Sequence, residues 1–402
     1  MHPESVIRRA EPRQTAQVHF ADGRIYEASV GTTLETYIQE IDFDLPAPIV
    51  AAHINGELRE ITYHIVTDSE VTPITIADSD GMRIYRRSLA FLMVTVAEEL
   101  FPDVQVVIDY ALNFGGFYCE VRGRVPFEPE ELARIEARMR ELVDADLPIG
   151  KKRVPLEKAL AYFEAKGHTD KVKLLKARKK DYLTLYTLAG AKDYYHGYMV
   201  PSTGYLQKFA LQPYGPGFVL QYPRRELPSV IQKPVDYPKL VAVFNEYREW
   251  MDLMGISNVG RLNEANEVGR MSEVILVAEA LHEQLIARIA TDIAEQHPFV
   301  RLVLIAGPSS SGKTTFSKRL SIQLLAHGVR PATLALDDFF VSREDTPRDE
   351  RGDYDFESLY ALDLSLFNDV LLRLMDGEEV TLPRFNFVAG LREAGDTFRI
   401  RQ

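Results

Sequence analysis

A short loop late in the chain carries residue types that bind phosphate. Residues 307–314 satisfy the pattern G-x-x-x-x-G-K-[ST] in full. Its glycines permit a tight backbone path, Lys313 can neutralise β and γ phosphates, and the Thr314 hydroxyl can ligate Mg²⁺. We expect the loop to bind ATP and Mg²⁺ through Gly307, Ser309, Ser310, Ser311, Gly312, Lys313, Thr314 and Thr315. The alternative is a Gly/Ser loop that only connects a strand to a helix.

The elements around this loop should form a parallel sheet. The apolar run 302–306 precedes the loop and predicts a buried parallel strand, a helix follows the loop, and residues 332–336 predict a second strand. Asp337 and Asp338 stand at the end of this second strand, where ligands of such sheets bind. One of the two carboxylates could accept a hydroxyl proton during catalysis. A helix cap, or an acid that holds the ligands of Mg²⁺ in place, is the other interpretation.

Several motifs in residues 307–392 together resemble the uridine kinase and phosphoribulokinase family of P-loop kinases. They are GPSSSGKTT from Gly307, LDDFF from Leu336, DYDF from Asp353, DGEEV from Asp376 and LPRFNF from Leu382, ending at Arg392. The resemblance implies a P-loop domain in which Asp337 activates the 5′-hydroxyl of a nucleoside. It also implies that the acceptor binds to Asp355, Phe385, Phe387 and Arg392.

The acceptor motif departs from the family pattern. The usual Tyr-Asp-Phe is Phe385-Asn386-Phe387, and the histidine that reads the base in the pyrimidine kinases falls on Gly390. The base of the acceptor therefore stays open. Because two phenylalanines offer a stacking surface, we expect a nucleoside rather than a sugar phosphate.

The front of the chain predicts two α+β domains and a helical connector. Residues 14–78 show a hairpin, a helix capped by Thr32 or Thr33, a strand and an Asn-Gly turn, which is the order of a β-grasp domain. Residues 79–222 alternate amphipathic helices with short strands. Six prolines between positions 213 and 238 mark a boundary, and residues 223–296 predict a helical connector before the kinase-like part at 297–402.

The two front domains resemble the N-terminal half of threonyl-tRNA synthetase. The motifs are DG, GTTL and NGEL in the β-grasp unit, then RRSLAF from Arg86, FGGFYCEV from Phe114 and DYYHGYMVPSTG from Asp193. The four metal and proton-relay positions of the editing domain are Arg87, Phe91, Tyr195 and Met199 here. Since these side chains are not the usual donors, the resemblance implies a degenerate editing domain without zinc.

Composition limits the class of protein. The net charge of −12 repels a phosphate backbone, so six basic residues in positions 171–180 favour a solvated helix face over RNA binding. The single cysteine, Cys119, excludes an internal disulfide and predicts a buried apolar role. The first residues lack the apolar core of a secretory signal, and the mostly apolar run 89–97 is too short to span a bilayer. We expect a cytoplasmic protein without a membrane partner.

The sequence favours an ATP-dependent nucleoside kinase, uridine-kinase-like, that transfers the γ-phosphoryl to a ribose 5′-hydroxyl, with a binding or regulatory front half. The alternative is an RNA- or tRNA-binding regulator in which the loop acts as a nucleotide switch. A further strand and a lid expected of such kinases are not found before Gln402. We therefore expect this chain to be an incomplete kinase with low turnover and a tendency to associate with copies of itself.

Overall fold

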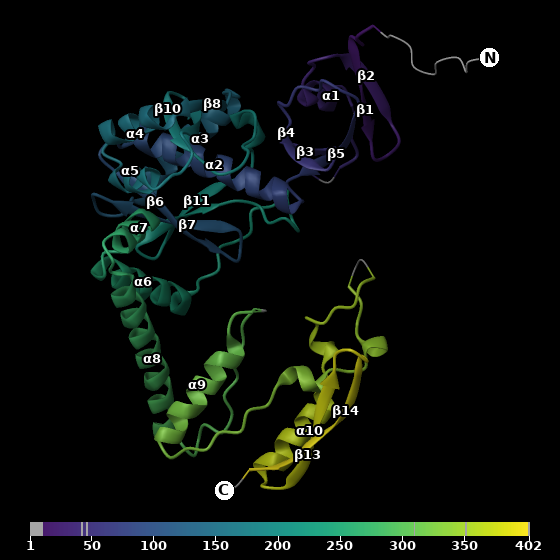
Figure 1. The fold of residues 1–402 in the computed structure, drawn as a ribbon, viewed down its shortest axis with the longest axis vertical. Helices are drawn as coiled ribbons and strands as arrows, with labels where there is room; N and C mark the ends of the chain where they lie inside the picture. The colour runs from purple at the N-terminus through teal and green to yellow at the C-terminus, as the bar shows by residue number, and fades with distance from the viewer. Residues whose placement is uncertain (1–10, 42, 46, 309, 350–351, 401–402) are drawn as a thin grey trace, which may run out of the picture. The chain divides into compact units, whose positions relative to one another are not determined.

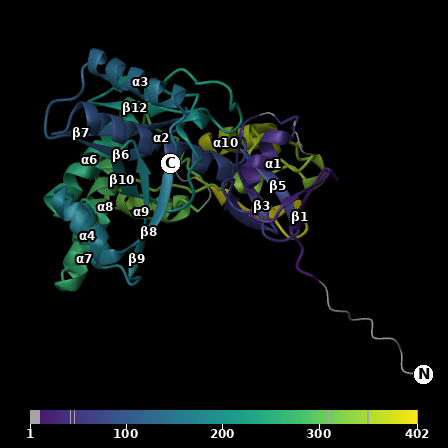
Figure 2. The same ribbon diagram turned by 90° about the horizontal axis from the view of Figure 1, so that it is seen from above.

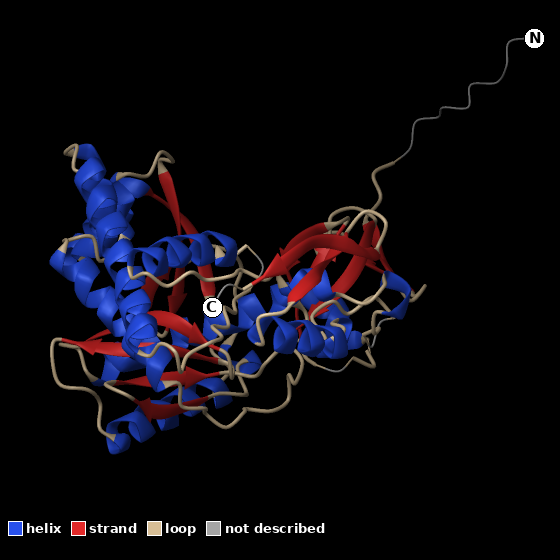
Figure 3. Ribbon diagram, turned by 90° about the horizontal axis from the view of Figure 1, so that it is seen from below, coloured by secondary structure: helices blue, strands red, loops and turns tan. Residues whose placement is uncertain are grey.

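The computed structural model describes residues 11–41, 43–45, 47–308, 310–349 and 352–400. Contacts divide the chain into two compact units, Met1–Gly269 and Arg270–Gln402. The strands, red in Figure 3, form several separate sheets, and the protein is a multidomain α+β chain. Within the described ranges, no helix combines the length and apolar character needed to cross a bilayer.

The first sheet of unit 1 is mixed. Its strand order is β2-β1-β5-β3-β4, and β1 pairs with β5 in parallel. The hairpin and the third strand lie where the sequence predicts them, and Thr33 rather than Thr32 caps the helix by accepting a hydrogen bond from the Thr36 amide at 3.3 Å. The elements are β1 (Thr15–Phe20), β2 (Ile25–Ser29), α1 (Leu34–Glu40), β3 (Ile49–Ile54), β4 (Glu57–Glu60) and β5 (Ser69–Thr75).

The largest core of unit 1 lies between two long helices and a four-stranded antiparallel sheet. The helices α2 (Ser79–Leu100) and α3 (Pro129–Asp144) bury Leu89, Leu92 and Ile135 in this core, and Figure 2 shows both helices beside strands of the sheet. The strand order is β11-β12-β7-β6, with β6 (Gln105–Leu112), β7 (Gly116–Arg122), β11 (Ala210–Tyr214) and β12 (Gly217–Gln221).

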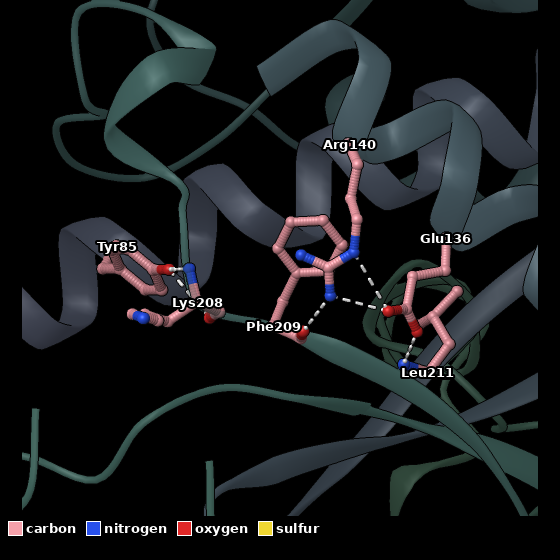
Figure 4. A network of polar contacts seen from close by, with 6 residues as sticks. All are labelled: Tyr85, Glu136, Arg140, Lys208, Phe209 and Leu211. Atoms are coloured by element: carbon pink, nitrogen blue, oxygen red, sulfur yellow. Dashed lines mark hydrogen bonds and ion pairs between the residues drawn. The ribbon is translucent and has the colours of Figure 1, made fainter. Parts of the chain in front are cut away.

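A network of polar contacts ties α2 and α3 to the segment that leads into β11 (Figure 4). The Tyr85 hydroxyl donates to the Lys208 carbonyl at 2.8 Å and accepts from the Lys208 amide at 2.9 Å. Arg140 donates to the Phe209 carbonyl at 2.9 Å, and Glu136 accepts from the Leu211 amide at 2.8 Å. Because these bonds satisfy backbone groups at a strand entry, they fix where β11 begins.

A smaller three-stranded sheet and its helices complete the middle of unit 1. The strand order is β10-β9-β8, and α4 and α5 bury Phe163 and Leu175 in a separate core. The elements are β8 (Gly150–Pro155), α4 (Leu156–Ala165), α5 (Thr169–Lys176), β9 (Tyr182–Leu188), β10 (Ala191–Tyr194) and the 3₁₀ turn η1 (Thr203–Tyr205).

The helices of the expected connector are divided between the two units. The helices α6 (Pro238–Leu253) and α7 (Val259–Glu267) pack on unit 1, whereas α8 (Met271–Glu295) belongs to unit 2. Arg248 of α6 forms ion pairs with Asp109 at 3.5 Å and Glu120 at 2.9 Å. These ion pairs and the stacked rings of Tyr110 and Phe244 hold α6 against β6 and β7.

Unit 2 contains two packed groups of elements. In the first, α8 and α9 (Lys313–Ala326) lie side by side (Figure 1) and bury Ile286, Ala290, Leu320 and Leu324. In the second, Phe339, Val370, Leu374 and Val380 form a core. Its elements are η2 (Leu336–Phe339), η3 (Arg343–Asp345), η4 (Leu359–Ala361), α10 (Leu364–Met375), β13 (Glu379–Asn386) and β14 (Leu391–Arg399).

The prediction of parallel strands at 302–306 and 332–336 is wrong for the described residues. Neither segment belongs to a strand, and residue 336 opens η2 instead. Leu302, Val303 and Leu304 are 45%, 41% and 73% exposed, so the run is not buried. A parallel strand needs neighbouring strands for its hydrogen bonds and helices on both faces for its burial, and an apolar run supplies neither partner. The sheet found in the described part of unit 2 is the antiparallel pair β13–β14.

Gly81 in the first turn of α2 generates a stability prediction. A Cβ at this position would lie 1.9 Å from the carbonyl oxygen of Thr75. Because this oxygen belongs to the backbone, it cannot move aside as the end of a side chain can. Gly81→Ala should therefore lower the free energy of unfolding of unit 1 by about 3 kcal/mol or more. Fluorescence of Trp250, the single tryptophan, during urea unfolding measures the loss. Ser79→Ala, an exposed change in the same turn, should shift stability by less than about 0.5 kcal/mol.

Asp363 generates a pH prediction, because it caps α10 by accepting a hydrogen bond from the Leu366 amide at 3.0 Å. This bond, followed by Arg392, holds the pKa of Asp363 below its usual value, so its stabilisation exists above pH ~4 and fades as the pH falls through the lowered pKa. Asp363→Ala should destabilise α10 by about 1 kcal/mol at pH 7, and by less below pH ~4.

Hydrogen exchange of residues 364–375, expressed as protection factors, measures this effect. Asp369→Ala is the matched control, since Asp369 is an exposed acid in the middle of the same helix, 3.5 Å from Arg373. An equal loss of protection in both variants, or a difference from the wild type that grows with acidity, would contradict the assignment of Asp363 as the cap.

Candidate active site

The phosphate loop ends in a left-handed residue from which α9 begins. Gly312 has φ of 88° and precedes Lys313, the first residue of the helix. The Phe316 amide donates to the Gly312 carbonyl at 2.9 Å, which starts the helical hydrogen bonding. Among the described residues, the amides of Lys313, Thr314 and Thr315 have no acceptor. These free N–H groups and the positive end of the helix dipole suit an anion.

Lys313 folds back over the loop that it follows. Its Nζ donates to the carbonyl of Gly307 at 2.8 Å and to that of Pro308 at 3.0 Å, and the side chain is exposed. A Cβ on Gly307 would lie 2.8 Å from the Ser311 hydroxyl, which would have to rotate away. Lys313 is thus held at the mouth of the loop as an exposed charge.

The described part of the loop fits a nucleoside triphosphate. Three free amides, an exposed lysine and the exposed Thr314 side chain offer donors and one hydroxyl ligand. The described residues contain no group of three or more His, Cys, Asp and Glu side chains placed to hold a metal ion. Ser309, predicted as a phosphate contact, lies outside the described residues, and Ser310 has φ of 59°.

The two acids of the LDDFF segment differ in their surroundings. Asp338 is partly buried, and its Oδ1 accepts a hydrogen bond from the Phe385 amide at 3.2 Å. Asp337 is exposed, and among the described residues its carboxylate has no hydrogen-bond or ion-pair partner. Asp338 therefore attaches η2 to β13 through one carboxylate oxygen, whereas the exposed Asp337 carboxylate makes no such attachment.

Aromatic side chains from three separate segments meet beside these acids. Phe340 contacts Phe385 with ring centres 5.6 Å apart and Phe356 at 5.9 Å, and Phe385 contacts Phe387 at 5.2 Å. Phe385 is buried, whereas Phe387 is 58% exposed. The structure thus brings together the LDDFF, DYDF and LPRFNF motifs, and the rings of Phe356 and Phe387 stay exposed to solvent.

Asp355 and Arg392 make local contacts. Asp355 accepts a hydrogen bond from the Glu357 amide at 3.1 Å, which shapes the turn after the aromatic motif. Arg392 donates to Asp363 at 2.9 Å and so supports the start of α10. Arg392 stands opposite Phe385 in the β13–β14 pair, which keeps it on the hairpin that carries the exposed ring.

Arg343 is a residue of this region that sequence reasoning missed. Its amide donates to the Gly390 carbonyl at 2.8 Å, and its Nη2 donates to the Phe387 carbonyl at 2.6 Å. Gly390 has φ of 71°, and a Cβ there would lie 2.9 Å from the Cβ of Arg343. Gly390 itself is the signal in the sequence that could have indicated a tight turn with a close neighbour.

The phosphate loop and the acid pair belong to different groups of packed elements in unit 2. Within the described ranges, no hydrogen bond or ion pair connects residues 307–315 with Asp337 or Asp338. The loop belongs to the group of α8 and α9, whereas the acids belong to the group of α10 and β13.

The four positions where the resemblance places metal and proton-relay donors carry other side chains here, and most of them are packed. Phe91 and Met199 are buried, and the rings of Phe91 and Tyr195 are 5.3 Å apart. Burial raises the pKa of the Tyr195 hydroxyl well above its usual value. Cys119 is fully buried, as expected for a small apolar side chain, and burial raises the pKa of its thiol to about 12. Phe91, Tyr195 and Met199 are therefore packed in the core of this domain. The buried Cys119 thiol offers no reactive thiolate.

Comparisons with known proteins separate the two ends of the chain. Residues 302–400 match the model of the phosphoribulokinase / uridine kinase family. The N-terminal region is 34% identical over 195 residues to a threonine–tRNA ligase of Janthinobacterium sp. (strain Marseille), which covers 48% of this chain and 31% of the relative. A threonine–tRNA ligase of Methylobacillus flagellatus is 33% identical over 195 residues, with 48% and 31% covered. One from Acidovorax sp. (strain JS42) is 34% identical over 191 residues, with 47% and 30% covered.

The matched part thus spans under a third of the length of each of these ligases. The family match and the ligase similarity concern different segments, and the kinase-like motifs at Gly307, Asp337 and Phe385 all lie inside the family match. The chain therefore joins an N-terminal region similar to threonine–tRNA ligases to a C-terminal segment that matches the phosphoribulokinase / uridine kinase family.

Proposed function

We propose that this protein is an ATP-dependent phosphotransferase that transfers the γ-phosphoryl group to the ribose 5′-hydroxyl of a nucleoside. The observation that carries the proposal is the start of α9, where free amides and Lys313 form an anion site inside the segment that matches a kinase family. The front half binds a ligand or regulates the kinase segment.

In this reaction the loop supplies charge and orientation. The amides of residues 313–315 and the Lys313 ammonium bind the phosphates of ATP, and Thr314 provides a hydroxyl ligand for Mg²⁺. Bound Mg²⁺ neutralises developing phosphate charge. Lys313 has to leave the carbonyls of Gly307 and Pro308 to reach a phosphate, so nucleotide binding exchanges two neutral acceptors for charged ones.

The acceptor side uses the acid pair and the aromatic rings. Asp337 takes the proton of the 5′-hydroxyl, since Asp338 is engaged with the Phe385 amide. The exposed ring of Phe387, supported by Phe385, offers a face on which a nucleobase can stack. This favours a nucleoside over a sugar phosphate as acceptor.

A second function is an RNA- or tRNA-binding regulator in which the loop acts as a nucleotide switch. The observation that favours it is the similarity of the N-terminal region to threonine–tRNA ligases. The basic helix α5 contributes less, because Lys171 and Lys173 pair with Asp193 at 2.8 Å and Glu264 at 2.6 Å. Those ion pairs reduce the charge available for a phosphate backbone.

One experiment separates the two functions. The full chain is incubated with ATP, Mg²⁺ and each of the common ribonucleosides, and nucleoside monophosphate is measured; salt-dependent tRNA binding is measured in parallel. Product with any nucleoside supports the kinase. Salt-dependent tRNA binding without product supports the regulator and refutes the kinase.

Lys313→Ala tests the loop. Removal of the ammonium should abolish ATP-dependent turnover and weaken ATP binding, while hydrogen exchange of α9 stays unchanged, because the side chain is exposed and contacts only loop carbonyls. Lys318→Ala, an exposed lysine on the same helix, is the matched control and should retain turnover. Unchanged ATP affinity and turnover in Lys313→Ala would refute the kinase proposal.

Asp337→Asn and Asp338→Asn test the assignment of the base. Asp337→Asn should lower kcat by about 10²-fold or more with little change in ATP affinity, because it removes the proton acceptor. Asp338→Asn should have a smaller effect, because the amide oxygen still accepts from Phe385. Steady-state kinetics with ATP and the best nucleoside measure both, and a larger loss from Asp338→Asn would show that Asp338 is the base.

A further inference from the structure

Arg87 on α2 in unit 1 is a half-buried cation without an anionic partner. Its Nη1 donates to the Tyr198 carbonyl at 2.5 Å. This is its single hydrogen bond within the described ranges, where it also forms no ion pair. Since a guanidinium carries five N–H donors, most of its donor capacity is unused by the protein.

The arginines near it on the same helix are placed differently. Arg83 is exposed and pairs with Asp80 at 3.0 Å, and Arg86 lies over the Phe117 ring at 5.8 Å. Burial lowers the pKa of Arg87, and Arg86 and Arg83 lower it further, whereas Tyr186 acts in the opposite direction. The charges that act on Arg87 therefore include two arginines and no carboxylate, a situation that an added anion would relieve.

The backbone opposite Arg87 is shaped to lie against the guanidinium. Gly197 has φ of 106°, and a Cβ there would lie 2.8 Å from Nη1 and 2.9 Å from Nη2 of Arg87. The Tyr186 hydroxyl donates to the Gly197 carbonyl at 2.8 Å, which fixes this segment. Among the described residues, the amides of Gly197 and Tyr198 have no acceptor. Free backbone donors thus lie next to the unpaired guanidinium.

We propose that Arg87 and the backbone at residues 197–198 form a binding site for an oxyanion, a carboxylate or a phosphate group of a small ligand. The planar guanidinium can bind either group through two parallel hydrogen bonds, and the adjacent amides add donors. The site lies in unit 1, whereas the phosphate loop lies in unit 2, so the proposal is independent of the proposed kinase function.

Equilibrium dialysis with labelled inorganic phosphate and with labelled acetate tests the site. All proteins carry Lys313→Ala, so that the cation of the phosphate loop does not contribute. The full chain with Arg87 should bind at least one probe saturably, and Arg87→Met should weaken that binding by about tenfold or more. Arg86→Met is the matched control, since Arg86 is equally half-buried on the same helix, and it should keep the binding.

The outcomes are distinct. The site is supported if saturable binding of phosphate, of acetate or of both is lost in Arg87→Met and kept in Arg86→Met. The probe that binds identifies the anionic group that the site takes. No saturable binding of either probe, or equal binding in Arg87→Met, overturns the proposal. If Arg87→Met does not fold by Trp250 fluorescence, Arg87→Lys carries the test: it keeps the charge without the planar fork and should bind more weakly, and equal affinity overturns the proposal.

Discussion

The left-handed backbone at Gly312 is the constraint on which the phosphate site depends. A residue with a Cβ is strained at φ of 88°, so this position favours glycine. The left-handed conformation of Gly312 lets α9 begin at the next residue. Because the helix starts immediately afterwards, the amides of its first turn remain free and Lys313 stands beside them. The packing of α9 on α8 through Leu320 and Leu324 then holds this helix end in place. Local backbone geometry and helix packing together place the groups of the proposed anion site.

The acceptor region depends on one long-range hydrogen bond. The Phe385 amide and the Asp338 carboxylate are 47 positions apart, and their contact joins β13 to η2. The ring contacts of Phe340 with Phe356 and Phe385 follow from that attachment. This arrangement gives two neighbouring acids different tasks, since one holds the structure and the other stays free.

In the front half, three of the four positions where the resemblance places metal and proton-relay donors hold packed side chains. Phe91 and Met199 are buried, the rings of Phe91 and Tyr195 are 5.3 Å apart, and burial raises the pKa of the Tyr195 hydroxyl. Arg87 occupies the fourth position but keeps access to solvent and an unpaired charge. Unit 1 thus carries a cation without an anionic partner, on a scaffold that Arg140, Glu136 and Tyr85 help to hold.

The sequence by itself determined the features that depend on neighbouring residues. The phosphate loop, the start of α9 after Gly312, the Asp22-Gly23 hairpin and the start of α6 at Pro238 all follow from short-range conformational preferences. The tertiary structure alone decided which elements pair. An apolar run at 302–306 does not specify a strand partner, and the predicted parallel sheet is not formed in the described residues. The different surroundings of Asp337 and Asp338, the packing of Arg343 on Gly390 and the surroundings of Arg87 likewise depend on contacts across 44 to 111 positions, which no local pattern encodes.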